Sequence, residues 1–375
     1  MSATWCTDSS MNKVVTSFAW NHEGLGHVSR LIGIHTVIRQ RGLESLFFVE
    51  HHQQLIDDYQ LPQVVVPSHP HSLVAEDWWI GKSNGMDYPR ARNLSASIVR
   101  DATRHMDCVI VHDVVVHRSL YDEAVAKGWS QSLVYRDRKD VDDPVAWIQI
   151  NAPEINVLYW LGKPHIRQQF NDLQVVGVHD VVRPLLGENS IWSPEAMGPD
   201  CLRVVITAGG GGHPDAQQFL QNSIDAIAGF SEKCSKAMFL VVVTGPYFRG
   251  VIRIPKRFNA TATVTPYLNP TLSQYIDTSL LISQGGYNTF NEARQYNQPV
   301  VIVPGNRMLD DQVARGMSAA KNSSWIHSIA ASGTVLEINN SIESVTGHLP
   351  PSDSCPGGQS PNGADEIAEH ISGLF

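Results

Sequence analysis

The residues from Ser283 to Glu292 have types and spacing that suit phosphate binding. They read Ser-Gln-Gly-Gly-Tyr-Asn-Thr-Phe-Asn-Glu, and the apolar run Pro299 to Pro304 follows them. A strand that ends in paired glycines and opens a helix leaves backbone N–H groups unpaired, and such groups bind phosphate. Further along, Asp311 and Gln312 carry side chains that can hydrogen-bond to sugar hydroxyls. Together these residues predict a pocket for a nucleotide sugar.

The same residues also allow purely structural roles. Thr289 and Glu292 fit a capping box, in which the glutamate binds the backbone N–H of the threonine and contacts no ligand. Asp310 and Asp311 equally fit the start of a helix, where acidic side chains cap the backbone and are favoured by the helix dipole. Local sequence leaves both alternatives open.

A histidine near the N-terminus is the candidate for acid–base chemistry. His27 lies at the expected start of a helix, where the dipole disfavours the imidazolium and keeps a neutral base available. Asp113 ends a strand in the same half, as expected of a carboxylate that orients His27. The alternatives are that His27 is only a polar helix-start residue and that Asp113 is a helix N-cap; His112 is a neighbouring candidate.

Two glycine-containing loops differ in what they predict. The loop Gly24 to Arg30 superficially suggests a dinucleotide fingerprint, but Ser29 replaces its third glycine. The run Gly209 to Gly212, in particular Gly210 and Gly211, lets the backbone approach a bound diphosphate closely, although four glycines also suit a flexible turn. His213 follows at a helix entry and can add a hydrogen-bond donor to phosphate.

The elements that must position these residues follow a repeated strand-to-helix order. An apolar strand from Val14 to Trp20, a helix with an apolar stripe from Leu31 to Ile38, and a strand from Ser45 to Val49 form a βαβ unit, which favours a parallel sheet. Short strands are also expected at the ranges 108–111, 132–135 and 175–178. The second half restarts with a strand at 202–207, a helix at 215–230 and strands at 238–243, 280–283 and 300–303.

This pattern predicts two domains with a terminal helix. We expect one domain over residues 1–190, a second over 191–363, and a helix over 364–375 that can pack back on the first domain. The Trp-, His- and Pro-rich segment from Pro67 to Pro89 shows no clean period and is expected to be a long functional loop.

Composition limits the classes of function. The 375 residues are 42% hydrophobic and 17% charged, as in globular chains, and the net charge of −9 argues against nucleic-acid binding. The five cysteines are scattered singly, as expected of reduced thiols in the cytoplasm, and no pair has zinc-site spacing. No window approaches the roughly 20 apolar residues of a membrane span. A cytoplasmic protein without an integral membrane segment is therefore expected, with its oligomeric state unassigned.

At these motifs the chain resembles the GT-B glycosyltransferases, in the branch of the peptidoglycan N-acetylglucosaminyltransferase and related antibiotic transferases. The loop Gly24 to Arg30 is similar to that branch's GxGHxxR-type opening, and Gly285 to Thr289 with Glu292 is similar to its donor signature. The likeness is strong over Val264 to Gln312, moderate in the first 50 residues and weak between Pro67 and Asp200. It implies an α/β GT-B fold, with two Rossmann-like parallel-sheet domains facing a central cleft.

The resemblance also implies residue roles. Tyr267 and Leu268 would receive the nucleobase and Glu292 the ribose, while Asp311 with Gln312 would bind the donor sugar. The donor signature begins at Gly285. Its next residues would face the diphosphate: Gly286, Tyr287, Asn288 and Thr289. His27 would activate the acceptor, and inversion at the anomeric carbon would need neither a bound metal nor a cofactor.

These inferences predict a hexosyltransferase-type enzyme of secondary metabolism. It would move a sugar from a UDP- or dTDP-sugar to a hydroxyl or amine of a soluble small-molecule acceptor, such as an antibiotic. On the acceptor side we expect Gly26, His112, Trp78 and Trp79, since sugars and aglycones stack on aromatic faces. The alternatives are a nucleotide-sugar epimerase or hydrolase on the same fold, and a non-catalytic subunit that binds nucleotide sugars.

Overall fold

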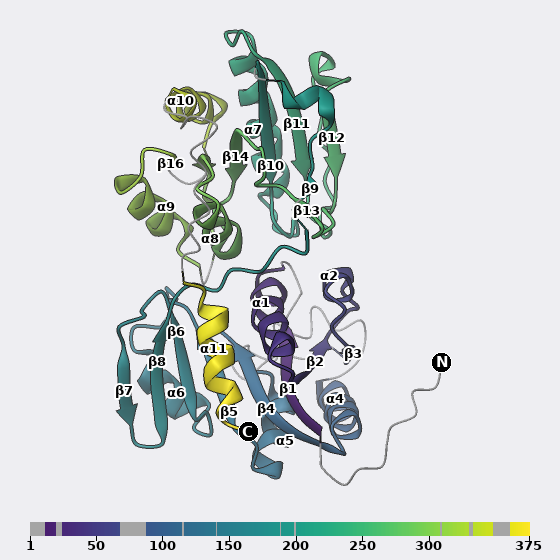
Figure 1. Cartoon of the computed structure of the whole chain (residues 1–375), viewed down its shortest axis with the longest axis vertical. Helices are drawn as coiled ribbons and strands as arrows, with labels where there is room; N and C mark the ends of the chain where they lie inside the picture. Colours follow the sequence, from purple (N-terminus) through teal and green to yellow (C-terminus); the bar gives the residue numbers. More distant parts are fainter. Residues whose placement is uncertain are drawn as a thin grey trace.

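The structure is a computed structural model of the chain. It describes residues 12–19, 25–67, 88–114, 116–139, 141–187, 189–198, 200–307, 310–329, 333–347 and 361–375. Within these ranges the chain forms two α/β lobes, each around its own sheet, one above the other in Figure 1. The N lobe contains the sheet of residues 12–178, and the C lobe contains the sheet of residues 201–328.

The N lobe has an eight-stranded sheet in the order β3-β2-β1-β4-β5-β6-β8-β7. Every neighbouring pair is parallel except β7 with β8, which is antiparallel. Its strands are β1 (Asn12–Ala19), β2 (Glu44–Val49), β3 (Gln63–Val65), β4 (Met106–Asp113), β5 (Gln131–Tyr135), β6 (Val157–Leu161), β7 (Arg167–Phe170) and β8 (Leu173–Val178). Its helices are α1 (Gly26–Gln40), α2 (Gln54–Asp58), α4 (Tyr88–Ala102), α5 (Arg118–Lys127) and α6 (Pro144–Asn151).

The C lobe has a parallel six-stranded sheet in the order β12-β11-β10-β14-β15-β16 and a small two-stranded sheet. The large sheet consists of β10 (Cys201–Thr207), β11 (Ala237–Val243), β12 (Ala262–Thr265), β14 (Leu280–Ser283), β15 (Val300–Ile302) and β16 (Ile326–Ser328); β9 (Asn189–Ser190) pairs with β13 (Leu272–Ser273). Its helices are η1 (Pro194–Met197), α7 (Ala216–Ser231), η2 (Lys256–Phe258), α8 (Tyr287–Gln295), α9 (Gln312–Lys321) and α10 (Val335–Thr346).

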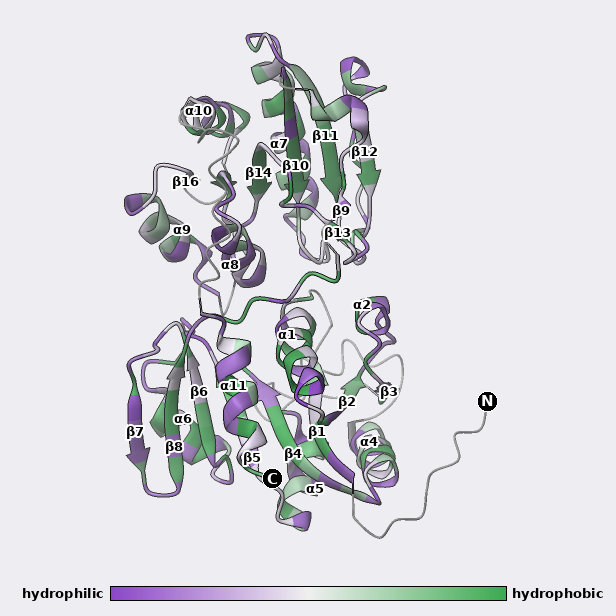
Figure 2. Cartoon of the chain, in the orientation of Figure 1, coloured by the Kyte–Doolittle hydropathy of each residue, from purple (hydrophilic) through white to green (hydrophobic). Residues whose placement is uncertain are grey.

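Hydrophobic patterning explains why these segments are strands. All four residues of β14 are buried, as are six of the eight in β1, which fits a sheet covered on both faces by helices. In Figure 2 the central strands of both lobes are coloured as hydrophobic, whereas the surface helices mix both colours. The edge strands differ: all four residues of β7 are exposed, and β3, β12 and β16 contain no buried residue.

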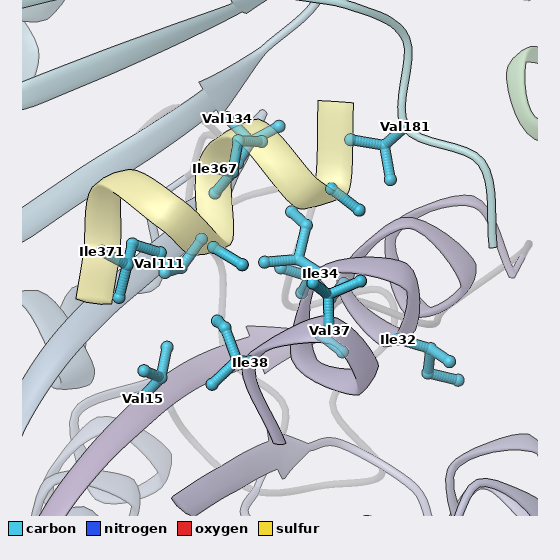
Figure 3. Close-up of a cluster of buried hydrophobic side chains, with 14 of the residues drawn as sticks. Val15, Ile32, Ile34, Val37, Ile38, Val111, Val134, Val181, Ile367 and Ile371 are labelled. Atoms are coloured by element: carbon cyan, nitrogen blue, oxygen red, sulfur yellow. The ribbon is translucent and has the colours of Figure 1, made fainter. Parts of the chain in front are cut away.

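The C-terminal helix α11 (Gly363–Ser372) packs on the N lobe. Ile367 and Ile371 are fully buried and lie against α1 and the sheet, near Ile34 and Ile38 (Figure 3). The chain before α11 is bonded to the segment that leaves β8: the Gly363 N–H donates to the Asp180 carbonyl at 3.1 Å, and the Asn362 side chain binds both backbone groups of Val182 at 2.8 and 3.0 Å. Two passages of the chain between the lobes are therefore fastened side by side.

The expected fold class, two lobes built on parallel sheets, is confirmed. The sequence did not predict β3, β6, β7 and β16, nor the small pairing of β9 with β13 inside the turn-rich stretch. β7 was not predicted because its residues are all exposed and show no hydrophobic pattern. Most of the long loop expected from Pro67 to Pro89 lies outside the described residues. Among the described residues, no helix is long and apolar enough to cross a membrane.

Candidate functional site

A cavity of about 520 Å³ lies between the lobes and gathers residues from many loops. From the N lobe it is lined by the start of α1 and by Arg136, which follows β5. From the C lobe it is lined by the loops after β10, β12, β14 and β15. Ligands of open α/β sheets bind beyond the carboxyl ends of the strands, and these loops are such ends.

His27 and Asp113 form a hydrogen-bonded pair at this cavity. The His27 Nδ1 atom lies 2.7 Å from Asp113 Oδ2 and 3.1 Å from the Asp113 backbone carbonyl oxygen. Since both neighbours are acceptors, Nδ1 must carry the hydrogen, and a neutral ring then has its lone pair on Nε2. The imidazole lines the cavity and is 25% exposed, whereas Asp113 is buried. This arrangement is suited to general-base chemistry.

Arg30, one turn further along α1, binds the carboxylate of the His27–Asp113 pair. Its Nε and Nη2 atoms donate to the two carboxylate oxygens of Asp113 at 2.7 and 2.8 Å. Burial alone would raise the pKa of Asp113, but the charge of Arg30 and the hydrogen bonds from His27 and Arg30 outweigh it and lower that pKa to about 2. Asp113 is therefore a fixed negative charge beside the imidazole.

Two backbone turns suited to anions face the pair across the cavity. One is formed by Gly209 to Gly211, in which Gly209 and Gly211 have φ values of +63° and +74°. A Cβ at Gly211 would lie 2.1 Å from the Thr244 carbonyl oxygen, so a side chain would not fit there. The other is the N-terminus of α8, where Gly286 is the N-cap without a side-chain capping bond. Its first amides are available to an anion.

The predicted donor signature lies largely at this cavity. Its lining includes Gly210, Gly211, His213, Tyr267, Leu268, Gly286, Tyr287, Asn288, Thr289, Glu292 and Gln312. Gly285 is not among the lining residues. It has a φ of +69°, and a Cβ there would lie 2.6 Å from Ile302 Cγ2, so it shapes the turn itself.

The capping box proposed for Thr289 and Glu292 is not formed. The helix α8 begins at Tyr287, two residues before Thr289. The buried Glu292 carboxylate instead accepts a hydrogen bond from the Tyr275 hydroxyl at 2.6 Å and lies 3.6 Å from Arg183 Nε. Glu292 is thus held at the cavity by side chains and does not cap the helix.

Of the two roles that the sequence left open for Asp311, the structure shows helix capping. Its carboxylate caps α9 by accepting from the Ala314 N–H at 2.9 Å, and it lines a neighbouring pocket between the lobes, not this cavity. In this loop the carboxylate that lines the cavity belongs to Asp310. Gln312 lines it too, with its Oε1 atom accepting from the Gly305 N–H at 2.9 Å. The N-cap alternative thus describes the side chain of Asp311.

Of the residues predicted to bind the acceptor, some line the cavity and others do not. Gly26 lines the cavity, and its carbonyl oxygen accepts from Asn288 Nδ2 at 2.8 Å across the lobes. His112 does not line it: neighbouring positions of a strand point to opposite faces, and His112 is buried with its Nε2 3.0 Å from Gln131 Oε1. Burial lowers the pKa of His112 to about 4. Trp78 and Trp79 lie outside the described residues.

His213 belongs to a charged network at the far wall. Its Nδ1 atom lies 3.0 Å from Asp215 Oδ1, and Arg307 Nη1 lies 3.1 Å from both oxygens of Asp215. Gln284 accepts from Arg307 Nη2 at 2.8 Å and donates to Asp215 at 3.1 Å. Burial would raise the pKa of Asp215, but hydrogen bonds from Gln284 and the charge of Arg307 lower it overall. This network fixes the orientation of His213 at the cavity wall.

Sequence reasoning assigned no role to the arginines of the site. Among the described residues, four arginines line the cavity, namely Arg30, Arg136, Arg183 and Arg307. Arg30 had a local signal, since it follows His27 by one helical turn. Arg136 follows a buried strand, where side chains of parallel sheets converge. Arg183 and Arg307 lie in loops without such a signal. Among the described residues, no cluster of three or more His, Cys, Asp or Glu side chains could hold a metal ion.

Solved structures with this architecture include several glycosyltransferases. The spinosyn forosaminyltransferase superposes with a TM-score of 0.63 at 14% identity, covering 97% of this chain and 99% of its own. A glycosyltransferase of Streptomyces sp. SF2575, solved with thymidine diphosphate, gives 0.58 at 14% identity, covering 96% and 99%. A UDP-N-acetylglucosamine 2-epimerase candidate from Listeria monocytogenes gives 0.57 at 8% identity, covering 96% and 95%.

No protein-family model and no curated protein matches the sequence. The structural likeness, however, spans nearly the whole chain and both lobes. The chain has the GT-B fold and is structurally similar to nucleotide-sugar glycosyltransferases of secondary metabolism.

Proposed function

We propose that the chain is an inverting, metal-independent glycosyltransferase. It would transfer a sugar from a UDP- or dTDP-sugar to a hydroxyl or amine of a small-molecule acceptor. One observation carries the proposal: the His27–Asp113 pair and the N-terminus of α8 open into the same cavity from opposite lobes. A base and an anion site on facing walls are what a direct displacement at a sugar phosphate requires.

The proposed reaction is a single displacement. The acceptor oxygen or nitrogen attacks the anomeric carbon while His27 Nε2 takes its proton, and the bond from that carbon to the diphosphate oxygen breaks. Attack opposite the leaving group inverts the configuration. Asp113, buried and charged, stabilises the imidazolium that forms.

The departing diphosphate would be stabilised by the C lobe. The first amides of α8 and the glycine turn at Gly209–Gly211 supply backbone donors, and His213 supplies a side-chain donor. The nucleobase would stack near Tyr267 and Leu268, and the ribose hydroxyls would bind Glu292. The thymidine diphosphate bound to the Streptomyces enzyme supports a pyrimidine nucleotide as the leaving group.

Product analysis tests this proposal. Purified protein is incubated with UDP- and dTDP-sugars, with and without a panel of hydroxyl- and amine-bearing acceptors, in the presence of excess EDTA. We expect glycosylated acceptor of inverted configuration and free nucleoside diphosphate, both unaffected by EDTA. A retained configuration, or a rate abolished by EDTA and restored by a divalent ion, would contradict it.

A second candidate, a nucleotide-sugar epimerase or hydrolase, is favoured by the likeness to the Listeria structure. Such an enzyme converts the donor without any acceptor, so the incubation with donor alone distinguishes it. A non-catalytic binding subunit would bind nucleotide and give no product in either incubation.

A further inference from the structure

We propose that Arg136 of the N lobe binds the donor phosphate nearest the sugar, so that the diphosphate is held from both lobes. This inference rests on the proposed function. It adds a charged contact from the lobe opposite the glycine turns and the α8 N-terminus, which would otherwise bind the diphosphate from one side.

The first support is where Arg136 lies. It directly follows β5, lines the cavity together with His27 and Gln312, and has a side chain that is 14% exposed. Its Nη1 atom is 2.6 Å from Asp310 Oδ1, across the boundary between the lobes. The guanidinium thus contacts the loop that would bind the sugar, in the cavity that His27 also lines.

The second support is unused hydrogen-bonding capacity. Among the residues that the structure describes, the buried Nε atom of Arg136 has no hydrogen-bond partner. Arg183 shares this feature, although its Nε lies 3.6 Å from Glu292 Oε1. Arg30, by contrast, uses Nε and Nη2 on Asp113 and its Nη1 lies 3.4 Å from Asn288 Oδ1, and Arg307 uses both Nη atoms on Asp215 and Gln284. A buried guanidinium donor without a partner is costly unless a ligand satisfies it.

The third support is the local balance of charge. Asp310 is shared between Arg136 and Arg315. The guanidinium carbons of Arg30, Arg136 and Arg315 all lie over the Tyr287 ring, at 5.0, 5.9 and 5.6 Å from its centre. Burial lowers the pKa of Arg136, and although Asp310 opposes this, the charges of Arg30 and Arg315 add to it. One more anion would relieve this repulsion.

The order of residues along the cavity indicates which of the two donor phosphates Arg136 would bind. Tyr267 and Glu292 would hold the nucleoside, the first turn of α8 the diphosphate, and Gln312 the sugar. Arg136 contacts the Tyr287 ring at the phosphate position and Asp310 at the sugar position. It therefore lies at the junction of the two, where negative charge develops on the diphosphate as its bond to the sugar breaks.

Calorimetric titration of nucleoside, nucleoside monophosphate and nucleoside diphosphate tests the inference, in whichever of the uridine or thymidine series the wild-type protein binds. In R136Q we expect diphosphate affinity to fall by about 10- to 100-fold, and monophosphate affinity to change less than about 2-fold, since a charge-assisted hydrogen bond is lost at one phosphate only. R136K, which keeps the charge without the planar fork, should recover part of the loss.

Lys139→Gln is the matched control. It removes the same unit charge three residues further along the same loop, from a side chain that is 38% exposed and does not line the cavity. It should leave all three affinities unchanged. Equal losses of mono- and diphosphate affinity in R136Q, or an unchanged diphosphate affinity, would overturn the inference. Failure of the wild-type protein to bind any nucleotide would instead refute the proposed function, and unligated melting temperatures identify a misfolded variant.

Discussion

At the scale of single residues, Asp113 is the group on which the candidate base depends. Its carboxylate is bound at once by His27 Nδ1 and by two nitrogens of Arg30. These contacts fix both the tautomer and the orientation of the imidazole. They also keep Asp113 charged at every pH at which the protein would work, because its pKa is lowered to about 2. The resting site is thus already arranged to receive a proton on Nε2.

His27→Ala should separate chemistry from binding. Losing a general base typically costs about 10²- to 10⁴-fold in turnover, and His27 lies on the wall opposite the glycine turns, so nucleotide affinity should stay within about 2-fold. Single-turnover rates and calorimetric titration of the nucleotide measure the two effects. Turnover equal to that of the wild-type protein would exclude His27 as the base.

Glu292→Gln should act on the other half of the site. The carboxylate binds the Tyr275 hydroxyl and lies near Arg183, and the amide would weaken both contacts as well as any bond to ribose. We expect nucleoside affinity to fall by about 10-fold, whereas the proton-transfer step should be unaffected in donor-saturated single turnovers. Equal nucleoside affinity in variant and wild-type protein would assign Glu292 a purely structural role.

At the scale of elements, the sequence predicted the site where a motif lies on one strand-to-helix turn. His27 and the turn at Gly286 were singled out because a helix start has a definite chemistry, and Asp113 because it ends a strand. Arg136 and Arg183 were not, because their contacts are with Tyr287, Asp310 and Glu292, far away in sequence. The choice between ligand binding and capping also needed coordinates, since α8 begins at Tyr287 and Asp311 directly precedes α9.

The docking of α11 gives a stability prediction at the same scale. Ile367 is fully buried in the N-lobe core, so Ile367→Ala should leave a cavity and destabilise the protein by about 2–5 kcal/mol. Glu369→Ala, on the exposed face of the same helix, should change stability by less than about 0.5 kcal/mol. Urea unfolding compares the two. Equal midpoints would mean that α11 contributes little to the N-lobe core.

For the molecule as a whole, the fold class followed from repeated strand-to-helix units, and this prediction did not depend on element boundaries. The small pairing of β9 with β13 could not be predicted, because each partner has two residues and they lie more than 80 positions apart. The sequence also did not show that the two lobes meet through side chains as specific as Tyr287 with Asp180 and Asn288 with Gly26.

Whole-molecule stability should fall in mild acid. Burial lowers the pKa of His35 to about 3 and that of His112 to about 4, whereas both titrate near 6.5 in the unfolded chain. Below pH 6.5 the unfolded state therefore binds protons that the native state does not. Each histidine should remove about 1.4 kcal/mol of stability per pH unit as the pH falls towards these values, and nothing above pH 7.

Urea midpoints between pH 4.5 and 7.5 measure this dependence. His112→Asn should flatten it by roughly one proton's worth of slope, about 1.4 kcal/mol per pH unit. An identical slope in the variant would mean that His112 is protonated in the native state.

The fastening of Gly363 and Asn362 to Asp180 and Val182 has a mechanical consequence. A molecule whose halves were joined by one flexible tether could twist freely about it. Here hydrogen bonds join the two covalent connections at one point, so we expect this point to act as a pivot and the halves to swing along a single arc. Such a swing would carry the first turn of α8 away from His27 and back to the same position, so that each closure restores the same alignment of base and phosphate site.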